Sequence, residues 1–96
     1  MRIHLVAAAV VVGMGIYTNV TLHEWLFLAI AIGLVVVAEL VNTGIEYLGD
    51  AITGEQDENI RNAKDVSAGA VLIAALTAAL IGGVVFIPKL ISMFVS

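Results

Sequence analysis

Three long apolar runs, separated by short polar segments, constrain what this chain can fold into. They cover residues 3–20, 25–48 and 64–87. Each run is roughly 18 to 24 residues long, enough for a helix to cross a bilayer core of about 30 Å with its backbone hydrogen bonds satisfied. Of the 96 residues, 61% are hydrophobic, and a soluble domain of this size has too little interior to bury so much apolar surface. The sequence therefore predicts an all-α membrane protein with three transmembrane helices, forming a single domain over residues 1–96.

The segments between and after the runs predict how the helices are connected. Thr21 and Glu24 have the spacing of a capping box, so we expect a tight turn before the second helix. Residues 49–63 are polar and acidic and predict a cytoplasmic loop. Pro88 and Lys89 predict the end of the third span, followed by an interfacial tail over residues 88–96. A cleaved signal peptide is the alternative for the first run, but no small-residue cleavage site follows it.

Composition and charge exclude several functional classes and predict an orientation. The chain has no cysteine, which excludes disulfides and thiolate metal sites, and its net charge of -4 argues against a nucleic-acid partner. With the N-terminus in the cytoplasm, Arg2, Arg61 and Lys64 lie inside and Lys89 lies outside. The basic residues thus predict a multi-pass protein with its N-terminus in the cytoplasm and its C-terminus outside.

Polar side chains recur on one face of the second run, which we call the polar stripe. The polar stripe consists of Glu39, Asn42, Glu46 and Asp50. At about 100° per residue these four positions fall within an arc of roughly 80°. Ionisable groups inside a membrane are costly and usually mark a functional site. If the second and third helices pack side by side, Lys64 and Asp65 meet the cytosolic end of the stripe.

This combination of groups favours phosphoryl transfer from a cytosolic nucleotide to a lipid alcohol. Mg²⁺ prefers one or two carboxylates together with phosphate oxygens, lysine is a common phosphate ligand, and a further carboxylate can accept the hydroxyl proton. Two alternatives stay open from these residues alone. The stripe could make interhelical hydrogen bonds in a noncatalytic membrane scaffold, or Glu39 could carry protons in an ion-conducting subunit.

Small residues on the third run predict close helix packing. They recur every four residues, at Ala70, Ala74, Ala78 and Gly82. Small residues at this spacing let membrane helices approach closely and often mark an interface. Three short helices cannot bury the polar stripe within one copy, so we expect a homo-oligomer.

Two segments resemble the paired signature of the prokaryotic diacylglycerol kinase family, which includes the undecaprenol kinases. They are AELVNTGIE at residues 38–46 and AKDVSAGAV at residues 63–71. The resemblance covers essentially the whole chain. It implies a small homotrimeric lipid kinase of the bacterial cytoplasmic (inner) membrane that uses ATP and Mg²⁺, with sites at subunit boundaries near the cytosolic surface.

The resemblance also implies a role for each polar residue that matches the family motif. Glu39 would be the base that takes the lipid hydroxyl proton, and Asn42 would orient the phosphate or the base. Glu46 would hold the metal ion bound to ATP, and Asp50 is a possible further site residue. The other implied nucleotide contacts are Glu55, Gln56, Asp57, Lys64 and Asp65.

The chain also departs from the family pattern at its start. Members usually begin with an amphipathic surface helix and a glutamate before the first span that is a second metal ligand. Here the sequence opens with Met1, Arg2, Ile3 and His4, so we expect both to be missing and the chain to assemble but phosphorylate poorly, as an inactive truncated member would. Residues 21–26, TLHEWL, favour undecaprenol over diacylglycerol as the lipid.

Overall fold

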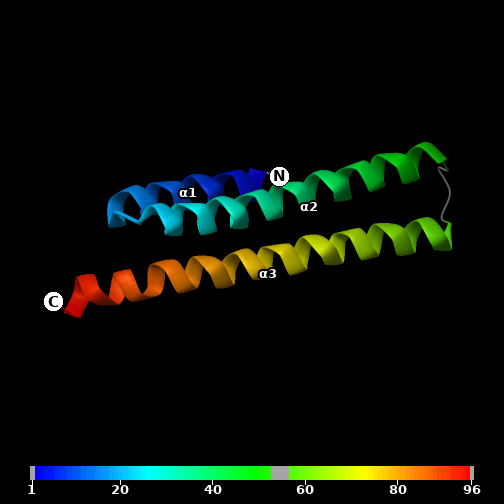
Figure 1. The fold of residues 1–96 in the computed structure, drawn as a ribbon. Helices are drawn as coiled ribbons and strands as arrows, with labels where there is room; N and C mark the ends of the chain where they lie inside the picture. The colour runs from blue at the N-terminus through cyan, green and yellow to red at the C-terminus, as the bar shows by residue number, and fades with distance from the viewer. Residues whose placement is uncertain (1, 53–56, 96) are drawn as a thin grey trace.

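The computed structural model describes residues 2–52 and 57–95, which form three helices (Figure 1). Helix α1 covers Arg2–Thr18, α2 covers Leu22–Ile52 and α3 covers Glu58–Val95. Helices α2 and α3 run antiparallel along each other, and α1 folds back along the first part of α2, so that the N-terminus lies about midway along α2 (Figure 1). The resulting rod measures 60 × 19 × 17 Å. The prediction of an all-α fold is confirmed for these residues.

Two of the three helices are long and apolar enough to cross a membrane. They are α2, with 31 residues, and α3, with 38 residues. Helix α1 has 17 residues, which gives about 25 Å at about 1.5 Å per residue, somewhat less than a bilayer core of about 30 Å. The first predicted span therefore stays a prediction. Large apolar side chains are exposed along all three helices, from Ile3 to Val95, and soluble monomers rarely expose so extensive an apolar surface.

The helices extend beyond the apolar runs that predicted them. Residues 49–52 and 58–63, expected in a loop, are helical, and α3 continues through Pro88 to Val95 instead of ending there. Proline removes one backbone hydrogen bond but its φ fits a helix, and Lys89 just beyond it pairs with Glu24 of α2 at 3.0 Å. This ion pair gives the last turns of α3 a partner that the sequence pattern did not reveal.

The turn between α1 and α2 is closed by two capping motifs. The predicted capping box is confirmed, because the Thr21 amide donates to Glu24 Oε1 at 2.8 Å and the Glu24 amide donates to Thr21 Oγ1 at 3.2 Å. Asn19 follows α1 with a φ of 56°, and the Val20 amide donates to the Gly15 carbonyl at 3.2 Å. Together with the bond from the Asn19 amide to the Ile16 carbonyl at 3.4 Å, this bond forms a Schellman motif, which reverses the chain within a few residues.

The best-packed part of the molecule lies beside this turn. Its buried residues are Val20, Leu28, Val85 and Phe86, with Val11, Met14 and Trp25 packed against them. A Cβ on Gly15 would lie 2.5 Å from the Trp25 ring, so glycine is what lets the indole pack against α1. The well-packed end therefore anchors α1 and the C-terminal part of α3 to α2, at the opposite end of the hairpin from the polar stripe.

Candidate functional site

The antiparallel register of α2 and α3 brings polar residues of both helices together near the connection between them. Lys64 Nζ lies 2.6 Å from Asp50 Oδ1, and Ser67 Oγ lies 2.6 Å from Asn42 Oδ1. The sequence predicted that Lys64 would meet the polar stripe, and the structure brings it there. Asp65 is exposed, since one residue further along a helix turns the side chain by about 100°.

Ser67 is the buried polar residue that joins the stripe to α3. Its side chain is 6% exposed, and its hydroxyl lies within hydrogen-bond distance of Asn42 Oδ1 and of the Lys64 carbonyl, at 2.6 and 2.9 Å. A hydroxyl carries one proton, so it donates to one of these acceptors at a time. Sequence reasoning did not include Ser67 in the site; the available signal was its position three residues after Lys64, on the same helical face.

Gly49 lets α3 approach α2 closely beside the ion pair. A Cβ at this position would lie 2.8 Å from Ile60 Cγ2 and 3.1 Å from Lys64 Cε. The stem of Lys64 therefore passes over the bare backbone of α2 on its way to Asp50. Gly49 is buried, and sequence reasoning did not identify it because a glycine near a helix end is more often a terminator.

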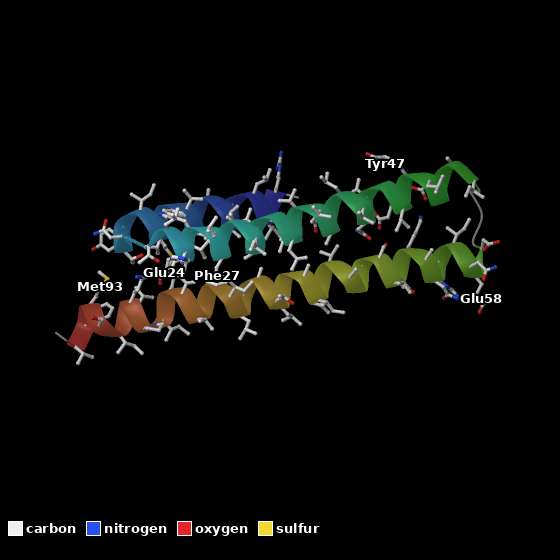
Figure 2. All side chains as sticks on the ribbon, viewed as in Figure 1. Glu24, Phe27, Tyr47, Glu58 and Met93 are labelled. Atoms are coloured by element: carbon white, nitrogen blue, oxygen red, sulfur yellow. The ribbon has the colours of Figure 1, made fainter. Side chains whose placement is uncertain are left out.

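Glu46 adds a second carboxylate near the lysine. It is exposed, and its negative charge acts on the Lys64 ammonium together with that of Asp50. Glu46 and Asp50 are four residues apart, and therefore neighbours on the surface of α2. The adjacent Tyr47 points away from α3 (Figure 2) and its side chain is exposed. This end of α2 thus presents carboxylate and phenol groups outside the contact with α3.

Glu39, the first residue of the polar stripe, contacts α1. Its Oε1 lies 3.0 Å from His4 Nδ1, and its side chain is 13% exposed. The roughly 80° arc of the stripe is wide enough to face two neighbouring helices, so Asn42 and Asp50 meet α3 while Glu39 meets α1.

The donor groups can be compared with the needs of a magnesium ion. Within residues 2–52 and 57–95, no three His, Cys, Asp or Glu side chains gather into a metal-holding cluster. Glu46 and Asp50 nevertheless offer two carboxylates on adjacent turns of α2. Mg²⁺ in nucleotide sites usually takes one or two protein carboxylates and completes its shell with phosphate oxygens and water. The residues present fit such a shared site and do not fit an all-protein cage.

The remaining predicted nucleotide contacts lie in the connection between α2 and α3. Glu55 and Gln56 are outside the described residues. Asp57 accepts a hydrogen bond from the Ile60 amide at 3.1 Å, which makes it the N-cap of α3. Sequence reasoning missed this capping role, although an aspartate directly before a helical run is a common start signal.

Comparison with known proteins places these residues in a wider context. The family profile described as prokaryotic diacylglycerol kinase matches residues 1–86. The chain is 36% identical to an undecaprenol kinase from Bacillus subtilis (strain 168) over 89 residues, which span 93% of this chain and 72% of that protein. It is 42% identical to a diacylglycerol kinase from Synechocystis sp. over 69 residues, spanning 71% of this chain and 39% of that protein. No solved structure gives a significant match.

Proposed function

The chain belongs to the prokaryotic diacylglycerol kinase family, and we propose that it transfers the γ-phosphoryl group of ATP to the hydroxyl of a membrane lipid alcohol. One observation carries this proposal: the Lys64 ammonium lies beside Asp50 and within the field of Glu46 at one end of the α2–α3 hairpin. Lysine binds phosphate as a point charge, and carboxylates share a magnesium ion with phosphates. A nucleotide approaching from the cytosol would meet both kinds of group.

The positions of the charges along α2 support a division of labour between lipid and nucleotide. The Glu24–Lys89 ion pair at the other end of the hairpin serves as a marker for the outer membrane surface. At about 1.5 Å per residue, Glu39 lies about 22 Å from Glu24 along the axis and Glu46 about 33 Å. With a core of about 30 Å, Glu39 falls within the cytosolic leaflet and Glu46 outside it. A lipid hydroxyl and a cytosolic nucleotide could therefore meet along this face.

In the proposed reaction, the Glu39 carboxylate accepts the proton of the lipid hydroxyl while the hydroxyl oxygen attacks the γ-phosphorus. The bond between the γ-phosphorus and the oxygen bridging to ADP breaks, and ADP leaves with the electron pair. Asn42 orients the phosphate or the base, and Ser67 fixes its amide through the 2.6 Å contact. Lys64 contacts the phosphates, and Asp65 contacts the nucleotide.

Glu46 is the proposed holder of Mg²⁺, with Asp50 one helical turn away as a possible further ligand. When bound, the ion neutralises charge on the phosphates and holds them for transfer. The charge opposite Asp50 in the structure is the Lys64 ammonium at 2.6 Å. Binding of the nucleotide would give Lys64 a phosphate partner and make Asp50 available to the ion.

We further propose a homotrimer in the bacterial cytoplasmic membrane, with the N-terminus in the cytoplasm and undecaprenol as the preferred lipid. Exposed apolar side chains along all three helices support assembly within the bilayer. The exposed positions of Glu46 and Asp65 leave room for a neighbouring copy to complete the site. The match to the undecaprenol kinase, which spans 93% of this chain, supports the choice of lipid.

Transfer of labelled γ-phosphate from ATP to undecaprenol or to diacylglycerol, in mixed micelles with Mg²⁺, tests the proposal. We expect phosphorylated lipid with the unaltered chain and a loss of roughly 10²- to 10⁴-fold with Glu39→Gln, the range for removal of a general base. Glu46→Gln should abolish the dependence on Mg²⁺ together with most of the activity. Glu24→Gln is the matched control, since it removes a carboxylate from the same helix at the other membrane surface, and it should retain activity.

Two results would contradict the proposal. Absence of product with both lipids would favour a noncatalytic role, and unchanged transfer by Glu39→Gln would exclude this residue as the base. Proton flux through vesicles without ATP would instead support the ion-conducting alternative.

A further inference from the structure

His4 of α1 contacts Glu39 of the polar stripe. His4 Nδ1 and Glu39 Oε1 are 3.0 Å apart, with side-chain exposures of 27% and 13%. The Nδ1 atom is itself buried and has no aligned hydrogen-bond partner among the described residues. The contact is therefore a close electrostatic approach, in which the ring nitrogen lies beside the carboxylate without a linear hydrogen bond.

The surroundings of His4 are apolar. His4 lies at the wall of a cavity of about 260 Å³ between the three helices. The other lining residues are all aliphatic: Ala7, Ala8, Val11, Leu28, Ala31, Ile32, Val35, Val36, Ala75, Ala78 and Ala79. A polar contact beside an apolar cavity is less screened than one in water. His4 is the one polar residue among those that line this cavity.

We propose that His4 is a positioning residue for Glu39, an inference that rests on the proposed kinase function. The two side chains are 3.0 Å apart and mostly buried, so each restricts where the other can lie. The imidazole holds the Glu39 side chain at the junction of α1 and α2 and fixes the direction from which it meets a lipid hydroxyl. His4 acts through Glu39 and does not touch the nucleotide groups around Lys64.

Variants of His4 separate positioning from a merely structural role. His4→Leu removes the polar ring but keeps much of its volume, whereas His4→Asn keeps an amide nitrogen close to the place of Nδ1. We expect His4→Leu to lower kcat by roughly 10- to 100-fold, the range for a misplaced reacting group, with the KM for ATP unchanged. His4→Asn should restore most of the kcat, and His23→Leu, the control at an exposed position in the first turn of α2, should have no effect.

A spectroscopic measurement tests the contact without relying on activity. The chain has two histidines, His4 and His23, so nitrogen NMR spectra of the full chain in micelles contain two imidazoles. We expect Glu39→Gln to shift the ring signals of His4 and to leave those of His23 unchanged.

The outcomes distinguish this inference from the proposed function. Unchanged kcat in His4→Leu, equal losses in His4→Leu and His4→Asn, or unshifted His4 signals in Glu39→Gln would each overturn it. A chain that phosphorylates no lipid alcohol would refute the kinase function and with it the kinetic role of His4. The NMR result would still show whether the two side chains are paired.

Discussion

Replacing Gly49 by alanine is expected to weaken the α2–α3 hairpin, although alanine is the better helix former. The new Cβ would lie 2.8 Å from Ile60 Cγ2 and 3.1 Å from Lys64 Cε, whereas carbon atoms pack comfortably at about 3.5 to 4.0 Å. Ile60 must therefore yield by about 0.7 Å. Overpacking of this kind costs about 1 to 3 kcal/mol, and the gain in helix propensity is about 1 kcal/mol. The net change in unfolding free energy is a loss of about 0 to 2 kcal/mol.

Gly44→Ala provides the matched control on the same helix. Beyond the neighbouring backbone of its own helix, a Cβ at Gly44 would have no atom of the described residues within 4 Å, so this variant keeps the propensity gain without the clash. The difference between the two variants cancels the propensity contribution and isolates the overpacking, about 1 to 3 kcal/mol. Reversible unfolding in mixed micelles, followed by circular dichroism, measures both. Equal stability of the two variants would refute the close approach of α3 at Gly49.

Two further predictions concern hydrogen bonds of the hairpin. Ser67→Ala should lower the free energy of unfolding by about 1 to 3 kcal/mol, because it leaves the Asn42 amide without its partner on α3. Adding Asn42→Leu should recover much of this loss in the same unfolding assay. An unchanged unfolding midpoint for Ser67→Ala would contradict the reasoning. Thr21→Ala removes the cap from the Glu24 amide and should lower the free energy of unfolding by about 1 kcal/mol. The control is Thr43→Ala, at an exposed position within α2, which should lower it by less when both variants are unfolded in parallel.

The sequence predicted the elements of this fold better than their ends. Apolar runs identified the helices because burial in lipid requires continuous hydrophobicity, and the Thr21–Glu24 spacing identified the capping box. The ends of α2 and α3 depend on side-chain contacts that the hydropathy of the sequence does not indicate. Examples are the Asp57 cap and the ion pair of Lys89 with Glu24.

The candidate site was predictable to the extent that it depends on helical periodicity. Periodicity placed Asn42 and Asp50 on one face, and antiparallel packing then brought them to Ser67 and Lys64. Helical periodicity could not predict the contact between Glu39 and His4, because this contact depends on how α1 packs along α2. His4 is separated from Glu39 by the whole α1–α2 turn, and no local spacing signals such a pair.

The polar stripe contacts two different helices within the described residues. Glu39 lies beside His4 of α1, whereas Asn42 and Asp50 contact Ser67 and Lys64 of α3. Glu46, one helical turn before Asp50, is exposed. A carboxylate that has no fixed cation can remain in the open only where water or a ligand reaches it. The Glu46 carboxylate therefore marks the face of α2 that the proposed nucleotide, or a second copy of the protein, would approach.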